Sequence, residues 1–198
     1  MKLTTLVLAS LSLFLFAGCN QQNRENMTLI PKKNDKTGKW GYINETGKKI
    51  ISFKYEDARN FQEGMASVKQ NRAYGYINKN GNMVVPLKYD YASDFSEELA
   101  RIKINGKYGF IDKNGNEVIQ AIHVEACDFL DGLAVVAKSF NNFNGTKYLK
   151  YGCIDKSGTL VTPINMMPSF HFQMEWQKYK LKKVVTVVTA LLTQPGKK

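Results

Sequence analysis

The stretch Tyr108-Gly109-Phe110-Ile111-Asp112-Lys113-Asn114-Gly115 decides the fold, because it joins a strand to a turn and recurs along the chain. Its first half is aromatic and β-branched, which favours a strand. Its second half favours a turn, since the side chain of Asp112 can accept hydrogen bonds from the backbone ahead and Gly115 accepts a positive φ. The stretch therefore predicts a strand that ends in a tight turn.

The same motif occurs four times in the 198-residue chain. The copies begin with the pairs Trp40-Gly41, Tyr74-Gly75, Tyr108-Gly109 and Tyr151-Gly152. Their glycines are 34, 34 and 43 residues apart, and the segment Ser139–Lys147 accommodates the longer spacing. Six residues after each motif glycine comes a turn glycine, in the order Gly47, Gly81, Gly115 and Gly158. A fixed period of this length indicates a repeat array.

Each repeat predicts about three short antiparallel strands. A second strand such as Met83-Val84-Val85 follows the turn, and a connection with an Ala and a Phe leads to a third strand, as at 99–104. Asn105-Gly106 then favours a tight hairpin into the next motif. The motif glycine lies inside a strand, so we expect a β-bulge or a close backbone approach there. One repeat cannot bury its Phe and Ile alone, so neighbouring repeats must complete its core.

These residues resemble the WG repeat family, named for the pair that occurs here as Trp40-Gly41. The resemblance spans residues 38–164. Its units lie at about 38–71, 72–105, 106–148 and, incomplete, 149–164. It implies an all-β tandem array of about four three-stranded antiparallel units, and a β-rich extracytoplasmic or accessory module, usually without known activity.

The later repeats depart from the family pattern at a few positions. Tyr replaces the motif Trp, and Cys153 replaces an aromatic residue. The third repeat has Ala121 and His123 where the earlier repeats have Phe53 or Leu87 and Tyr55 or Tyr89. We interpret these changes as drift in packing that does not alter the resemblance to the family.

The N-terminus has the pattern of a signal peptide. Lys2 precedes an apolar run from Leu3 to Ala17 that is shorter than the roughly 20 residues a membrane-spanning helix needs. The segment Leu15-Phe16-Ala17-Gly18-Cys19 resembles the lipobox of bacterial lipoproteins, although an aliphatic residue is more usual at Phe16. The resemblance implies a signal helix at 1–18 and acyl chains on Cys19, followed by a polar tether at 19–37. A buried helix or a short anchor is the alternative, and the polar residues that follow the run argue against it.

The lipobox resemblance also implies a location. A protein acylated at Cys19 is anchored in a membrane of the cell envelope, because two or three acyl chains hold firmly. Asn20 is uncharged, which resembles the outer-membrane sorting pattern of bacteria with two membranes. We therefore expect a lipid-anchored envelope protein, on the outer membrane if the host has one.

The net charge of +11 does not predict a nucleic-acid partner. Residues 165–198 carry six Lys and one Glu, while acids and bases alternate through the middle of the chain. No basic stripe or stacking motif accompanies the charge.

Residues 165–198 do not continue the repeat. In frame, they predict an atypical tail that is either β-prone or helical, or that seeks a membrane. We hypothesise instead a one-nucleotide frameshift near Asn165, because codons read across Asn165–Gln177 can encode the Tyr, Asp, Phe, Gly, Met and Ala that the repeat expects. A stop in the shifted frame before the codons of Val185–Val187 would exclude the hypothesis.

No catalytic, metal or cofactor site is predicted. His123 occupies a slot that holds Tyr in other repeats, which favours packing over catalysis. Asp112, Asn114 and Asn116 imitate the start of an EF-hand loop, but Glu117 and His123 stand where its glycine and glutamate are required. The other carboxylates recur with the repeat, whereas a catalytic pair has unlike environments. These carboxylates are Asp90, Asp94, Glu97, Glu98, Asp128 and Asp131.

Cys127 and Cys153 remain after Cys19 is assigned to the lipid. Outside the cytoplasm they can form a disulfide if neighbouring repeats bring them together. The alternative is two buried thiols.

The sequence therefore predicts a non-enzymatic binding module with an unidentified protein, peptide or glycan partner. Tyr55, Tyr89 and Tyr91 either line its recognition face or belong to its core. An envelope enzyme or an enzyme-associated accessory subunit is the alternative, and it would require a polar constellation in one repeat.

Overall fold

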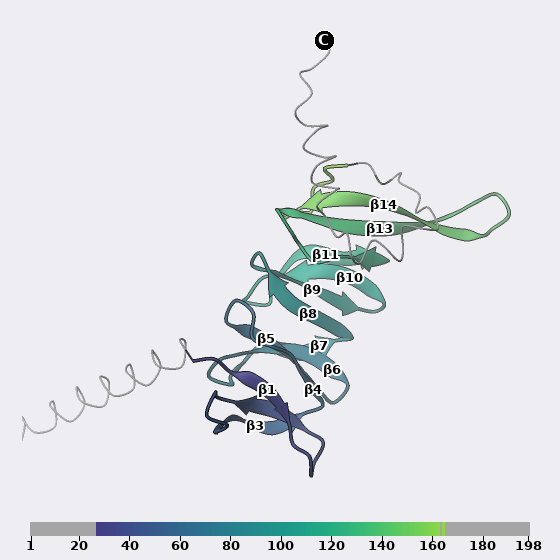
Figure 1. Cartoon of the computed structure of the whole chain (residues 1–198). Coiled ribbons are helices and arrows are strands. Elements are labelled where there is room, and N and C mark those ends of the chain that lie inside the picture. Colours follow the sequence, from purple (N-terminus) through teal and green to yellow (C-terminus); the bar gives the residue numbers. More distant parts are fainter. Residues whose placement is uncertain (1–26, 163, 165–198) are drawn as a thin grey trace, which may run out of the picture. The chain divides into compact units, whose positions relative to one another are not determined.

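The computed structural model describes residues 27–162 and 164, and the chain divides into two compact units, residues 1–88 and 89–198 (Figure 1). The predicted all-β fold is confirmed, because the described residues form strands in four small antiparallel sheets and no helix. The predicted signal helix at 1–18, Cys19 and the tail at 165–198 lie outside the described residues.

The first unit holds two sheets of consecutive strands. The first sheet has the order β1-β2-β3 and the second the order β4-β5-β6-β7. The strands are β1 (Ile30–Lys33), β2 (Trp40–Ile43), β3 (Lys49–Tyr55), β4 (Asp57–Ala58), β5 (Met65–Gln70), β6 (Ala73–Asn78) and β7 (Met83–Tyr89).

The second unit also holds two sheets, with the orders β11-β10-β9-β8 and β12-β13-β14. Its strands are β8 (Tyr91–Ser96), β9 (Leu99–Ile104), β10 (Lys107–Ile111), β11 (Glu117–His123), β12 (Glu125–Ala126), β13 (Leu133–Asn141) and β14 (Lys147–Asp155).

Each of the three later sheets combines the end of one sequence repeat with the start of the next. β9 pairs with β10 through Ile104 and Lys107, which is the hairpin expected at Asn105-Gly106. The connection expected between the second and third strands is itself a strand, since β8 pairs with β9. β4 and β12 are two-residue counterparts of β8. The expected units of about three short antiparallel strands are therefore confirmed as sheets of three or four strands, in which this connection supplies an edge strand.

The predicted tether at 19–37 requires a correction at Ile30–Lys33. These residues form β1, which pairs with β2 from Ile30↔Ile43 to Lys33↔Trp40. Leu29 just before it is only 6% exposed. The physical reason is that the first motif strand has no preceding repeat to pair with, so its free backbone groups need another strand. The polar, Pro-containing segment has no side-chain pattern that predicts a strand.

The four turn glycines have the positive φ that their turns predict, between 80° and 84°. In the third repeat, the carboxylate of Asp112 accepts hydrogen bonds from the backbone N–H groups of Asn114 and Asn116, at 2.9 and 2.8 Å. Asn44, Asn78 and Asp155 accept equivalent bonds in their own turns. The loop that imitates an EF-hand therefore uses its acidic side chain to hold its own backbone.

The motif glycines lie where the next strand comes closest. A Cβ on Gly109 would stand 2.6 Å from both the backbone N of Ala121 and the backbone O of Ile119. The β10–β11 register shifts at this point, since Tyr108 pairs with His123 and Phe110 with Ile119. Gly41 and Gly75 have the same crowding, at 2.6 and 2.5 Å. The expected bulge and the expected close approach therefore occur together.

Each unit has its own hydrophobic core, to which neighbouring repeats both contribute side chains. Tyr42, Tyr55 and Ile77 are fully buried in the first unit, and Phe110, Phe129 and Ile154 in the second. The turns contribute to this packing, because Cβ positions on Gly81 and Gly158 lie 3.4 and 3.3 Å from the side chains of Ile51 and Ile119. A turn of one repeat thus packs on the second strand of the repeat before it.

Candidate functional site

The third repeat differs from the first two at three consecutive positions at the end of its second strand. Phe53-Lys54-Tyr55 and Leu87-Lys88-Tyr89 correspond to Ala121-Ile122-His123. An exposed Lys has become an isoleucine that is 53% exposed, and a buried Tyr has become a buried His. The smaller side chains leave space, and the isoleucine makes the edge of that space apolar.

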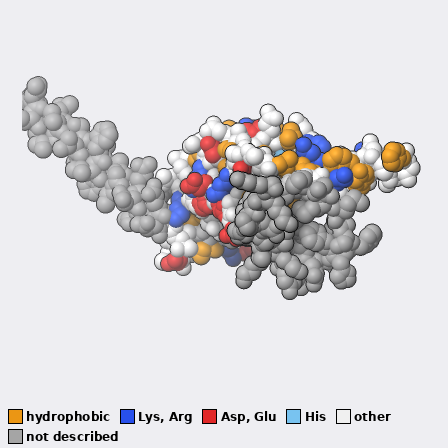
Figure 2. Space-filling model, turned by 90° about the horizontal axis from the view of Figure 1, so that it is seen from above, with side chains coloured by type: hydrophobic (Ala, Val, Ile, Leu, Met, Phe, Trp, Pro, Cys, Tyr) orange, Lys and Arg blue, Asp and Glu red, His pale blue; other side chains and the backbone are white. Residues whose placement is uncertain are grey.

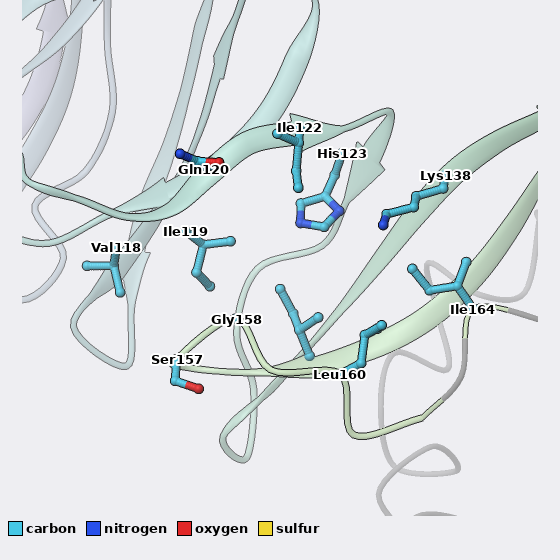
Figure 3. Close-up of a pocket in the computed structure, with 11 residues that line it drawn as sticks. Val118, Ile119, Gln120, Ile122, His123, Lys138, Ser157, Gly158, Leu160 and Ile164 are labelled. Carbon is cyan, nitrogen blue, oxygen red and sulfur yellow. The ribbon is translucent and has the colours of Figure 1, made fainter.

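A pocket of about 270 Å³ lies beside these residues, within the second unit (Figure 3). At about 30 Å³ for each water, it has room for roughly nine water molecules, or for one small ligand or side chain. Strand β11 supplies one wall, and β13, β14 and the turn after β14 supply the others. The lining residues are Val118, Ile119, Gln120, Ile122, His123, Lys138, Ile154, Ser157, Gly158, Leu160 and Ile164.

His123 is the unusual polar group of this pocket. It is 5% exposed, and its Nδ1 atom has no hydrogen-bond partner among the described residues. Burial lowers the pKa of His123, and the nearby positive charge of Lys138 lowers it further, so the ring is neutral at pH 7. Figure 3 shows the Lys138 side chain extending toward the imidazole. A buried nitrogen without a partner costs about 1–3 kcal/mol, which a bound hydrogen-bonding group would recover.

The recurring carboxylates serve the fold. Glu56 accepts hydrogen bonds from the backbone of Asn71 and Arg72, both at 3.1 Å, across the β5–β6 hairpin. Glu97 accepts one from the backbone N–H of Gly132 at 2.9 Å and pairs with Lys156 at 3.1 Å. Among the described residues, no group of three or more His, Cys, Asp or Glu is placed to hold a metal ion.

The aromatic motif residues also serve the fold. The hydroxyls of Tyr74 and Tyr151 donate to Asp57 and Glu125, at 3.3 and 2.8 Å, in equivalent places of two repeats. Burial, together with the Glu125 carboxylate, raises the pKa of Tyr151. Trp40 and Tyr108 pack at the edges of the two hydrophobic cores.

Two of the three tyrosines considered for a recognition face belong to the interior. Tyr55 is fully buried and Tyr89 is 4% exposed. Tyr91 is half-buried, with its ring 6.4 Å from that of Tyr108 and 5.4 Å from the guanidinium of Arg101. The core alternative is therefore correct for Tyr55 and Tyr89.

The disulfide left open between Cys127 and Cys153 does not form. The backbone N–H of Cys127 donates to Val135 at 2.9 Å, and Val135 pairs with Cys153 on its other side. The two cysteines are thus two strand spacings apart, about 10 Å, whereas a disulfide needs Cα atoms within about 7 Å.

In the part of the chain that the structure describes, no helix is long and apolar enough to cross a membrane. The sequence missed the pocket because its walls come from segments 118–123, 138, 154–160 and 164, which only the fold brings together. The available signal is the change at 121–123, and the interpretation of Ala121 and His123 as drift in packing does not predict a pocket.

Comparison with known proteins identifies the repeats. The family model described as WG containing repeat matches residues 40–72, 74–108 and 108–139, together about half of the chain. No curated protein and no solved structure matches the chain.

Proposed function

Because the chain belongs to the WG containing repeat family, we propose that it is a non-catalytic binding module, held at the cell envelope by a lipid on Cys19. The observation that carries the binding role is the His123 pocket. It lies in the repeat that departs from the others, and it holds a buried nitrogen without a partner among the described residues.

The chemistry of the pocket favours an apolar group that carries one hydrogen-bonding atom. Its edge has three exposed apolar side chains, Val118, Ile122 and Leu160, which are 41%, 53% and 48% exposed. A neutral imidazole either donates or accepts at Nδ1, and Lys138 adds a positive charge beside it. Of the three partner classes, protein, peptide and glycan, this combination favours an apolar side chain of a protein or peptide next to an acidic group.

The binding proposal is tested by restoring the sequence of the second repeat. Ile122→Lys with His123→Tyr reproduces residues that the fold already accepts at Lys88 and Tyr89. We expect this double variant to melt like the wild type and to lose its envelope partner in cross-linking followed by quantitative mass spectrometry. Met83→Lys is the matched control, because Met83 is an exposed apolar residue on a second strand of another repeat. Equal cross-linking of the double variant and the wild type would refute the pocket as the binding site.

The anchoring proposal rests on the lipobox-like segment that ends at Cys19. Cys19→Ser is expected to leave an unacylated, unprocessed precursor, detectable by intact mass. A mature N-terminus at another residue, or a Cys19 without lipid, would contradict the proposal.

The alternative of an envelope enzyme or accessory subunit has less support. Among the described residues, no carboxylate and no cysteine lines the pocket, and the buried base His123 has the charge of Lys138 beside it. General acid–base chemistry ordinarily pairs two groups of different pKa. An enzymatic role would require His123→Gln to abolish a turnover that the wild type performs.

A further inference from the structure

The hairpin of β13 and β14 carries the nine residues that the other repeats lack, and these residues extend it beyond the sheet. The strands stay paired from Leu133↔Asp155 out to Asn141↔Lys147. Residues 138–147 are all exposed. The extension therefore contributes nothing to the core and is free to contact a partner.

The tip of this hairpin is a turn of the same kind as the turns of the repeats. The backbone N–H of Thr146 donates to the side chain of Asn142 at 2.8 Å, and that of Gly145 to the backbone O of Asn142 at 3.0 Å. Gly145 has φ 80°, as the turn glycines have. The residue after the leading Asn or Asp is charged in all four repeat turns: Glu45, Lys79, Lys113 and Lys156. In the hairpin it is Phe143, which is fully exposed.

The turn does not require a phenylalanine, since charged residues occupy the same position four times. Its hydrogen bonds hold Phe143 at the outermost point of the hairpin. Removing an apolar ring from water lowers the free energy, and at this position only a binding partner can remove it.

Aromatic and basic side chains share one face of the hairpin behind the tip. The rings of Phe140 and Tyr148 stack at 6.0 Å, and the ammonium of Lys150 lies 5.2 and 5.8 Å from their centres. Lys138 pairs with Lys150, and Lys147 lies beside the turn. Residues 132–154 contain no Asp or Glu. Figure 2 shows hydrophobic and basic side chains together at this end of the second unit, at the right of the view.

We propose that this hairpin docks on an anionic lipid surface, with Phe143 entering the boundary between headgroups and acyl chains. The charge of the hairpin is complementary to acidic headgroups, and a single apolar tip suits a fluid hydrocarbon boundary. A nucleic acid fits less well, because bases stack on the face of an aromatic platform and Phe143 instead projects from a turn.

The proposal is tested with a local probe at the tip. The full chain carrying Phe143→Trp is reconstituted, with its natural N-terminus, into vesicles of phosphatidylcholine and phosphatidylglycerol that include a brominated lipid. We expect a blue-shifted emission and quenching of the new tryptophan, both measured against the wild type, whose own tryptophans remain. Lys113→Trp, at the equivalent turn position in the third repeat, is the matched control and should show neither change.

The lysines supply the second arm of the test. Replacing Lys147 and Lys150 by Gln should weaken docking about 25-fold, since each contributes about a factor of five near an anionic surface. Vesicles of phosphatidylcholine alone should give little quenching. Three outcomes would overturn the proposal: equal quenching at positions 143 and 113, quenching that does not depend on phosphatidylglycerol, or an emission change with single-stranded DNA but not with vesicles. Because the probe reports only on position 143, failure here is distinct from failure of the pocket or of the anchor.

Discussion

Replacing Gly109 by alanine is expected to destabilise the second unit much more than replacing Gly106, three residues earlier. A Cβ at position 109 would lie 2.6 Å from the backbone N of Ala121 and the backbone O of Ile119. An ordinary carbon–oxygen contact is about 3.3 Å, so the strands would have to separate by about 0.7 Å. Backbone hydrogen bonds of about 2.9 Å would lengthen to about 3.6 Å, at which they are no longer made.

The cost follows from the groups on either side of the glycine. Phe110, fully buried, pairs with Ile119, and Tyr108 pairs with His123. Two weakened hydrogen bonds at about 1–3 kcal/mol each give a loss of about 2–6 kcal/mol. Alanine also lowers the conformational entropy of the unfolded chain, which stabilises the folded state by about 0.4–1 kcal/mol. We therefore expect a net loss of about 2–5 kcal/mol.

Gly106→Ala provides the control. Gly106 has φ 75°, and nothing lies within 4 Å of a Cβ built there. The alanine therefore costs only the strain of a left-handed backbone, about 1–2 kcal/mol. The lower entropy of the unfolded chain offsets about 0.4–1 kcal/mol of this cost. At about 2–4 °C per kcal/mol, the melting temperature should fall by about 4–20 °C for Gly109→Ala and by at most about 6 °C for the control. Equal melts for the two variants would refute the argument from backbone crowding.

Three further predictions concern the thiols, the turns and the histidine. Alkylation of the denatured, unreduced chain should modify both Cys127 and Cys153, and a peptide that links them under non-reducing conditions would contradict the two-strand separation. Gly81→Val should cost about 1–2 kcal/mol or more and exceed Gly47→Val, because both have positive φ but only Gly81 faces the side chain of Ile51; equal urea midpoints would count against the packing between repeats. The pKa of His123 is lowered below its ordinary 6.5, so its contribution to stability is fully present above that pH and is lost as pH falls toward the folded-state pKa. His123→Phe should flatten this slope in urea titrations, and an unchanged slope would show that the buried ring is not its cause.

Most of the local fold was predictable because it depends on short-range chemistry. The turn at Asp112–Gly115 needs one acceptor side chain and one residue with positive φ, and both are visible in sequence. The hairpin at Asn105-Gly106 is equally local. The bulge at Gly109 was predictable for a related reason, since a glycine inside a strand costs stability unless a neighbouring backbone needs the space.

The candidate site was not predictable to the same degree. The sequence shows that His123 replaces a Tyr. Whether neighbouring side chains fill the space that the smaller ring frees, or leave a pocket, depends on Lys138 and Leu160, which lie 15 and 37 residues further along the chain. The same limit explains the disulfide that was left open. Cys127 and Cys153 both border Val135, and the sequence alone did not place them on opposite sides of it.

The sheets are offset from the sequence repeats, and this offset explains why strand β1 forms. The three later motif strands, β6, β10 and β14, each pair with the last strand of the preceding repeat, as β10 pairs with β9. The first motif strand has no such neighbour, so residues with little strand propensity, Ile30–Lys33, take its place. Pairing of exposed backbone groups, and not side-chain pattern, selects this segment. By the same logic the first sheet depends on a segment outside the family match, and a chain cut at Trp40 would leave the edge of β2 unpaired even though every matched repeat remained intact.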